Sequence, residues 1–281
     1  MKKLFILGIT VLMFVLVLTG CQSNAGDVKN PSKQQKGANP TGNITIAGST
    51  SVQPLAEELA GAFADKYPDV RIDVQGGGSS VGVQSAKDGV ADIGNSSRDL
   101  KDSEKAYNLY EYTIAKDGIA IVINPSNQVD EITSDQIKKI FAGEITNWND
   151  LGGKDAVITV INREEGSGTR GAFEDIVMKD AAFIGSAIIQ PSTGAIKQTV
   201  STDPDAIGYI SMGSMDSGVK GLMIDGAQPN SDNVLNGSYK ISRPFLMLTK
   251  DEPQGAVKAF LDFIFSQEGQ DIVGQEFIKV K

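Results

Sequence analysis

Short strand patterns that run into polar loops and then into amphipathic helices recur along the chain from residue 43 onwards. In the first such unit, Ile44 and Ile46 alternate with polar residues before Gly48, and one apolar helix face follows from Val52 to Phe63. Alternation with a period of two indicates a strand, whereas apolar spacings of three and four indicate a helix. Repeated strand–loop–helix units predict an α/β fold.

The later units predict how the chain is divided. Further strands are expected at 70–74, 91–94, 118–123, 158–161, 206–211 and 245–249, and further helices around 81–86, 133–141, 173–177 and 257–264. No repeat of fixed period is present. If the segment from about Gly237 returns to the first part of the chain, two lobes joined by two crossings result. We expect residues 43–123 and 237–281 to form lobe I and residues 124–236 to form lobe II.

The N-terminus has the pattern of a secretion signal. Lys2 and Lys3 precede an apolar run from Leu4 to Leu18, which is shorter than the ~20 residues that a membrane-spanning helix needs. Small residues then lead into Cys21, the only cysteine, as in a bacterial lipobox. We expect residues 1–20 to be a signal peptide, Cys21 to carry a lipid anchor such as palmitate, and residues 21–42 to be a flexible linker. The protein would then sit on the extracytoplasmic face of the cell membrane.

Composition excludes several classes of function. The chain has 26 basic and 35 acidic residues, a net charge of −9, and no basic, aromatic stripe, so nucleic acid is not an expected partner. It contains no histidine, the commonest general base and transition-metal ligand. Serine hydrolases with a Ser-His-Asp triad, His-rich zinc proteases and His-relay phosphatases are therefore excluded.

Four expected strand-to-helix loops carry hydroxyl side chains. They contain Ser49-Thr50-Ser51, Ser79-Ser80, Ser96-Ser97 and Ser167-Gly168-Thr169. Free backbone N–H groups and the helix dipole favour an anion at a helix start, and hydroxyls add further donors. Arg98 and Arg163 flank two of the loops, and a guanidinium suits a tetrahedral oxyanion. Any one loop taken alone is better explained by ordinary capping and turn formation, and it is the four loops together with the arginines that favour an anion site.

Other glycine-rich segments and the single tryptophan carry less chemistry. The segment 166–169 lacks the spacing of a nucleotide phosphate loop, and Gly76 to Gly78 is not a dinucleotide fingerprint. Trp148 is expected to be a packing residue, with ligand stacking as the alternative.

The order and spacing of these motifs resemble a known family. The motifs are Ala47 to Ser51, Gly78 to Ser80, Asp92 to Arg98, Ile145 to Trp148, Arg163 to Thr169 and Gly208 to Ile210. From about residue 43 to the C-terminus the chain resembles the phosphate-binding proteins of ABC phosphate transporters, the PstS-like family. The resemblance implies a two-lobed, periplasmic-binding-protein-like α/β fold of type II, with the ligand in the cleft between the lobes.

The resemblance also implies the site residues. Matched motif by motif, the ligand would be bound by Thr50, Ser51, Ser79, Ser97, Arg163, Ser167, Gly168 and Thr169. Arg163 would be the main positive charge. Arg98 and Glu165 would lie behind these residues, with Glu165 orienting Arg163; a solvent-exposed loop charge is the alternative for Glu165.

One position departs from a well-known version of the family pattern. There an aspartate stands at the place of Ser97 and accepts a hydrogen bond from a protonated phosphate oxygen. A hydroxyl lacks the negative charge that would repel fully ionised sulfate, so discrimination against sulfate is in doubt.

We therefore expect a non-catalytic binding protein with no cofactor. Its expected partners are inorganic phosphate, the membrane permease subunits of an ABC importer, and the membrane itself through Cys21. The alternatives are a receptor for another oxyanion such as sulfate or molybdate, a phosphate-ester hydrolase with a serine nucleophile, and a surface adhesin or signalling protein.

Overall fold

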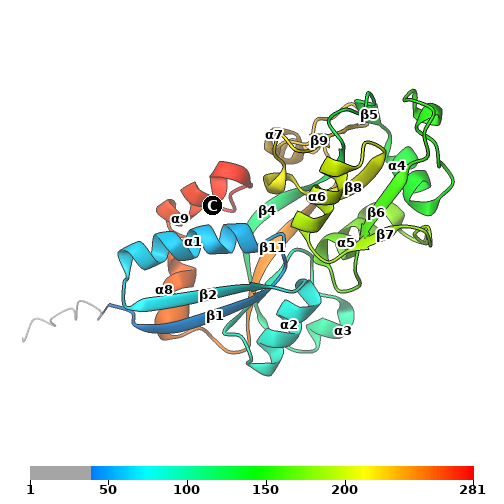
Figure 1. Cartoon of the computed structure of the whole chain (residues 1–281). Coiled ribbons are helices and arrows are strands. Elements are labelled where there is room, and N and C mark those ends of the chain that lie inside the picture. Colours follow the sequence, from blue (N-terminus) through cyan, green and yellow to red (C-terminus); the bar gives the residue numbers. More distant parts are fainter. Residues whose placement is uncertain (1–38) are drawn as a thin grey trace, which may run out of the picture. The chain divides into compact units, whose positions relative to one another are not determined.

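The computed structural model describes residues 39–281 of the chain, called the described unit below (Figure 1). The predicted signal peptide and Cys21 lie outside the described residues, as does the predicted linker apart from residues 39–42. Among residues 39–281, no helix is long and apolar enough to cross a membrane.

Strands and helices alternate through most of this unit, which confirms the predicted α/β class. The strands are β1 (Gly42–Gly48), β2 (Val70–Gly76), β3 (Ile93–Ser96), β4 (Tyr110–Ile123), β5 (Glu131–Ile132), β6 (Thr159–Arg163), β7 (Ile188–Gln190), β8 (Ala206–Ser211), β9 (Lys220–Gly221), β10 (Met223–Ile224) and β11 (Ser242–Thr249). The α-helices are α1 (Gln53–Lys66), α2 (Ser79–Asp88), α3 (Asp102–Lys105), α4 (Ser134–Ala142), α5 (Gly168–Phe173), α6 (Thr193–Thr202), α7 (Ser231–Leu235), α8 (Gly255–Ile264) and α9 (Gln267–Glu276). Shorter helical turns are η1 (Trp148–Leu151), η2 (Glu174–Met178) and η3 (Met212–Ser214).

The main sheet has the strand order β2-β1-β3-β11-β4-β8-β6-β7, and β9 pairs with β4. Strands β1, β2 and β3 are parallel, as are β6, β7 and β8. The long strands β4 and β11 are antiparallel to each other and separate these two groups. The carboxyl ends of β1, β3 and β6 lead into three of the hydroxyl loops. The loop with Ser79 and Ser80 follows β2, the edge strand.

Two large apolar clusters form most of the core, in addition to two smaller ones. The first includes Ile44, Leu59 and Phe63 together with Phe245 and Phe260 from the C-terminal segment. Because β11, α8 and α9 contribute to it, the end of the chain does return to the first part (Figure 1).

The second cluster includes Phe141, Trp148, Phe173 and Tyr209. Strand β4 supplies Ile114 to the first cluster and Ile119 to the second, so it crosses between them. The division into lobes at 43–123 with 237–281 and at 124–236 remains a prediction.

Helix α4 begins as its sequence predicts. The Thr133 hydroxyl accepts the N–H of Gln136 at 3.1 Å, and the Gln136 side chain accepts the N–H of Thr133 at 2.8 Å. This reciprocal capping box satisfies two N–H groups that the helix itself cannot pair. At the other end, Gly143 adopts φ 81°, the left-handed conformation that glycine allows at a helix end.

Three expectations about local structure differ from the observed elements. Strand β4 begins at Tyr110, well before the expected residue 118, because its polar first half is held by pairing with β11 rather than by an apolar pattern. Strand β3 lies at Ile93–Ser96 rather than 91–94. The helix expected around 81–86 is the longer α2 at Ser79–Asp88, in which Val81 is 48% exposed.

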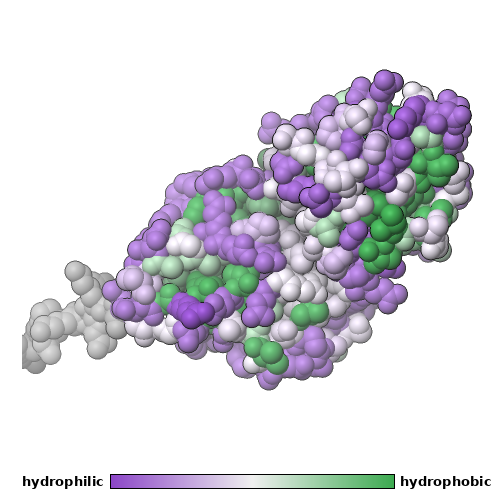
Figure 2. Space-filling view, viewed as in Figure 1, coloured by the Kyte–Doolittle hydropathy of each residue, from purple (hydrophilic) through white to green (hydrophobic). Residues whose placement is uncertain are grey.

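The surface seen in Figure 2 is largely hydrophilic, with apolar residues gathered in a few places. One such place lies over the region of β7, where Ile188 and Ile189 are exposed.

Candidate functional site

Three hydroxyl loops of the first part of the chain meet at the ends of β1, β2 and β3. Ser49 Oγ donates to Ser97 Oγ at 2.8 Å, and the N–H of Ser97 donates to Ser79 Oγ at 3.0 Å. The N–H of Ser51 donates to Ser49 Oγ at 3.2 Å. All four serines are at most 2% exposed. The sheet therefore gathers hydroxyls that are up to 48 residues apart in sequence.

The fourth loop reaches these serines from the other side of the crossing strands. Arg163 ends β6, and Ser167 caps α5 by accepting the N–H of Arg170 at 3.2 Å. The hydroxyls of Ser51 and Thr169 lie 2.9 Å apart, and either can donate. A backbone bond from the N–H of Ser80 to the carbonyl of Gly166, 3.0 Å long, joins the loop with Ser79 and Ser80 to the loop at 163–169 as well.

Gly168 allows this close approach. A Cβ atom at this position would lie 2.0 Å from Ser79 Oγ and 2.5 Å from Ser97 Oγ. Only a residue without a side chain fits between the two serines. Gly168 therefore allows the loops to approach each other, in addition to the ligand contact predicted for it through its N–H group.

Arg163 is the buried cation of this group, with 1% of the residue exposed. Its Nη2 donates to Thr50 Oγ1 at 3.2 Å, and its Nη1 to Thr193 Oγ1 at 3.4 Å. Its Nε and Nη2 also donate to the two carboxylate oxygens of Glu164, at 2.8 and 2.9 Å. A bidentate pair of this kind fixes the plane of the guanidinium.

The expected role of Glu165 needs correction. Glu165 is exposed and is recorded in no bond to Arg163, whereas its neighbour Glu164 makes the bidentate pair. Glu165 instead lines a shallow hollow with Lys101, Arg170 and Glu174. Adjacent residues of a loop point in different directions, and the sequence does not specify which of two neighbouring glutamates faces the arginine.

Arg98 lies behind the serines, and its guanidinium is occupied. Nη1 and Nη2 donate to the two oxygens of Glu104 at 2.7 and 2.8 Å, and Nη2 also reaches Ser80 Oγ at 3.2 Å. Burial disfavours the charged form of Glu104, but the bonds from Arg98 and from the N–H of Lys101 outweigh it, so the pKa of Glu104 is lowered. Arg98 thus fixes the loop that carries Ser97.

Two residues of the hydroxyl group were not among the predicted site residues. Thr193 Oγ1 lies 2.8 Å from Ser51 Oγ, and Ser49 bonds directly to Ser97. Thr193 follows β7 in the segment Ser192-Thr193-Gly194, which begins α6. This is a fifth strand–hydroxyl loop–helix junction, so the same sequence signal could have identified it.

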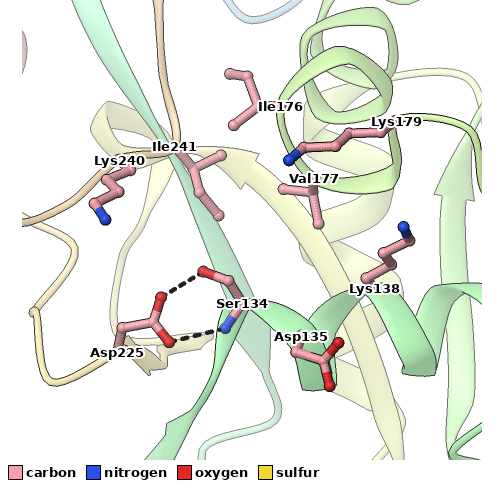
Figure 3. A pocket seen from close by; sticks show the side chains of 9 residues that line it. All are labelled: Ser134, Asp135, Lys138, Ile176, Val177, Lys179, Asp225, Lys240 and Ile241. Carbon is pink, nitrogen blue, oxygen red and sulfur yellow. Dashed lines mark hydrogen bonds between the residues drawn. The ribbon is translucent and has the colours of Figure 1, made fainter.

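Two hollows border the hydroxyl group: the one beside Glu165, which Ser167 also lines, and one beside Thr50 and Thr193. Thr50 and Thr193 line a hollow of about 330 Å³ together with Lys197, Asp216 and Glu276. A hollow of about 450 Å³, shown in Figure 3, is lined by residues of α4, η2 and the segments at 225 and 240–241. It shares no residue with the predicted site.

Within residues 39–281 no group of three or more His, Cys, Asp or Glu side chains is placed to hold a metal ion. Neither α1 nor α2 has a side-chain N-cap. The arrangement therefore offers hydroxyl and backbone donors with the buried guanidinium of Arg163, which suits a small oxyanion.

Comparisons with known proteins cover nearly the whole chain. Residues 33–268 match the profile of the PBP superfamily domain. The chain is 35% identical to the phosphate-binding protein PstS of Bacillus subtilis, over 99% of this chain and 95% of the relative. It is 30% identical to PstS of Borreliella burgdorferi, over 85% of this chain and 90% of the relative.

Solved structures agree with the sequence relatives. A putative phosphate ABC transporter substrate-binding protein from Clostridium perfringens, with bound phosphate, superposes with a TM-score of 0.84 at 48% identity, over 85% of this chain and 100% of that chain. An ABC-type phosphate transport receptor from Vibrio cholerae has a TM-score of 0.70 at 37% identity, over 85% of this chain and 100% of that chain. These matches confirm the predicted periplasmic-binding-protein-like fold class.

Proposed function

We propose that this chain, which belongs to the PstS family of phosphate-binding proteins, captures inorganic phosphate outside the cytoplasmic membrane and delivers it to an ABC-type importer. The matched relatives are binding proteins of transporters, and the chain belongs to that class rather than to the enzymes. The observation that carries the proposal is the meeting of buried hydroxyls from both sides of the crossing strands with the buried Arg163.

The proposed ligand contacts follow from the donors that converge. Phosphate is bound by Thr50, Ser51, Ser79, Ser97, Arg163, Ser167, Gly168 and Thr169, to which we add Thr193. Hydroxyls that bond to one another at 2.8 to 2.9 Å can rotate toward an anion, and hydrogen bonds to a charged acceptor are the stronger ones. Arg163 supplies the main positive charge, and Glu164 keeps it oriented.

The proposed ligand contacts come from both sides of the crossing strands, which links phosphate binding to closure of the site. Thr50, Ser51 and Ser79 approach from one side of the crossing strands, and Arg163 and Thr169 approach from the other. A ligand shifts a conformational equilibrium only if it binds one state better than the other. Phosphate can contact both sides of the site at once only when they are close together, so it favours the closed arrangement. The permease subunits then recognise the closed form.

We also propose that the protein is held at the membrane by a lipid on Cys21. The support is the basic, apolar and small-residue sequence of residues 2–20 before the single cysteine. A diacylated cysteine combines two acyl chains, which is what stable anchoring requires. Cys21→Ser should release the protein from cells and abolish incorporation of labelled palmitate; retained labelling would exclude this anchor.

The function is tested by calorimetric titration of residues 22–281, stripped of bound anions, with phosphate and then with sulfate. We expect phosphate to bind and Arg163→Ala to abolish binding while the circular dichroism spectrum stays unchanged. If Arg163→Ala binds normally, the assignment of that residue is wrong. If sulfate binds as tightly as phosphate, the protein is a general oxyanion receptor, and if neither binds, the proposed function is refuted.

A further inference from the structure

Side chains hold the backbone of Arg163 where the pairing of β6 with β8 has ended. The two strands pair only up to Val160 on β6. At Arg163 the N–H instead donates to Asn162 Oδ1 at 2.8 Å and is shared with the Tyr209 hydroxyl at 3.4 Å. The carbonyl of Arg163 accepts from Arg170 Nη1 at 3.1 Å. Both polar groups of the backbone from which the guanidinium extends are therefore fixed by side chains.

Tyr209 of β8 is fully buried and connects two parts of the proposed site. Its hydroxyl donates to Asn162 Oδ1, the same oxygen that accepts the N–H of Arg163. Its ring stacks on that of Phe173, the last residue of α5, with ring centres 4.3 Å apart and planes 5° apart. Helix α5 starts with two of the proposed ligand residues and packs beside β6 and β8 (Figure 1). One side chain thus joins the end of β6 to the start of the second group of donors.

A buried tyrosine needs an acceptor for its hydroxyl on grounds of stability alone, so burial does not by itself indicate a role in the site. Tyr239, in the same apolar cluster, meets this need by donating to the carbonyl of Ile119 at 2.8 Å. Tyr209 differs because its acceptor also binds the backbone of Arg163. Burial raises the pKa of Tyr209 more than the nearby Arg163 lowers it, so the hydroxyl remains a donor at neutral pH.

We propose that Tyr209 is a positioning residue of the anion site: its hydroxyl, together with Asn162, fixes the backbone of Arg163, and its ring fixes α5. The guanidinium and the loop at 163–169 are then in place before the ligand arrives. This inference rests on the proposed function. A donor that is already in place loses less conformational freedom on binding, so it contributes more to affinity.

Phosphate titration of Tyr209→Phe tests the role of the hydroxyl, because phenylalanine keeps the stacked ring. We expect phosphate affinity to fall about tenfold, the effect of one net hydrogen bond. Tyr239→Phe is the matched control, since it removes a buried hydroxyl from the same apolar cluster. Both variants should lose stability in urea unfolding, but Tyr239→Phe should bind phosphate like the unmodified protein.

A double-mutant cycle with Arg163→Lys supplies a readout that a merely structural role would not change. A planar guanidinium depends on a defined position, whereas a flexible ammonium group does not. If Tyr209 acts through the guanidinium, adding Tyr209→Phe to Arg163→Lys should cost less than about twofold in phosphate affinity.

Asn162→Ala provides a second cycle, which decides the matter if Arg163→Lys binds too weakly to be titrated or Tyr209→Phe does not fold. Asn162→Ala breaks the same chain of hydrogen bonds, so alone it should also lower phosphate affinity about tenfold. Adding Tyr209→Phe to it should then cost less than about twofold more.

Three results would overturn the inference. They are unchanged phosphate affinity in Tyr209→Phe and Asn162→Ala, an equal loss in Tyr239→Phe, and persistence of the full loss from Tyr209→Phe in either cycle. Failure of the unmodified protein to bind phosphate would instead refute the proposed function, so the two failures are distinguishable.

Discussion

Gly168→Ala tests whether the two sides of the site must come into direct contact. The Cβ atom of alanine would lie 2.0 Å from Ser79 Oγ, 2.5 Å from Ser97 Oγ and 2.9 Å from Ser79 Cβ. All three distances are shorter than any normal contact of a Cβ atom. The methyl group can be accommodated only if α5 and the serine loops move apart.

The size of the effect follows from the cost of inserting one carbon atom into a closely packed site. Overpacking by a methyl group costs about 1–3 kcal/mol. The apolar clusters on either side do not include Gly168, so the domain can stay folded while the loops separate. The cost then falls on the closed, ligand-binding arrangement, and phosphate affinity should fall by about fivefold to about 150-fold.

Calorimetric titration with phosphate measures this loss, and urea unfolding measures stability separately. Gly185→Ala is the matched control, because a Cβ atom at Gly185 would have no neighbour within 4 Å. We expect Gly185→Ala to bind like the unmodified protein. Unchanged phosphate affinity in Gly168→Ala would show that phosphate binding does not need the observed contact between the loops.

Three further changes probe stability. Gly61 lies inside α1 with open space around its Cα, so Gly61→Ala should raise the unfolding free energy by about 0.5–1 kcal/mol and raise Tm. Trp148 is fully buried and donates from Nε1 to the carbonyl of Asp205 at 3.0 Å, so Trp148→Phe should cost about 2 kcal/mol in urea unfolding without changing phosphate affinity. The pKa of Glu104 is lowered in the folded state, so its contribution is present above its unfolded pKa and is lost as pH falls through its folded pKa. Glu104→Gln should therefore lose about 3 kcal/mol at neutral pH, because it breaks the pair with Arg98, and this deficit should shrink in acid, as followed by urea unfolding across pH.

Local patterns predicted the elements that local interactions stabilise. The strand Ala206–Ser211 and the capping box at Thr133 were both predicted, because periodicity and capping depend on neighbouring residues. The first half of β4 and the whole of α9 were not. In β4 the residues before Gly118 are mostly polar, and their strand conformation depends on β11, which lies more than 120 residues away. Helix α9 has a mostly polar sequence and is anchored by few apolar residues such as Val273.

The candidate site shows the same limit. Hydroxyl loops at strand ends could be found in the sequence because each has the same local form, and Thr193 belongs to that pattern. The choice between Glu164 and Glu165 could not, since it depends on which direction each side chain takes from the loop. The buried ion pair between Arg243 of β11 and Asp117 of β4, outside the proposed ligand contacts, carries no motif either, because the two residues are 126 apart and meet only through the register of the two strands.

The direction of the hydrogen bonds bears on which anions the site accepts. The N–H of Ser51 donates to Ser49 Oγ, and the Ser49 hydroxyl donates in turn to Ser97 Oγ. Ser97 therefore accepts a bond within the protein, and its own proton can be shared with Ser79 Oγ, 3.4 Å away, or donated to a ligand oxygen. Among the described residues the carboxylate bonded to a proposed ligand residue is that of Glu164, and both of its oxygens are occupied by Arg163. A phosphate oxygen that carries a proton meets no carboxylate at Ser97, and fully ionised sulfate meets no repulsion there. Discrimination between the two anions, if titration reveals it, must then come from a hydroxyl turned to accept rather than from a buried negative charge.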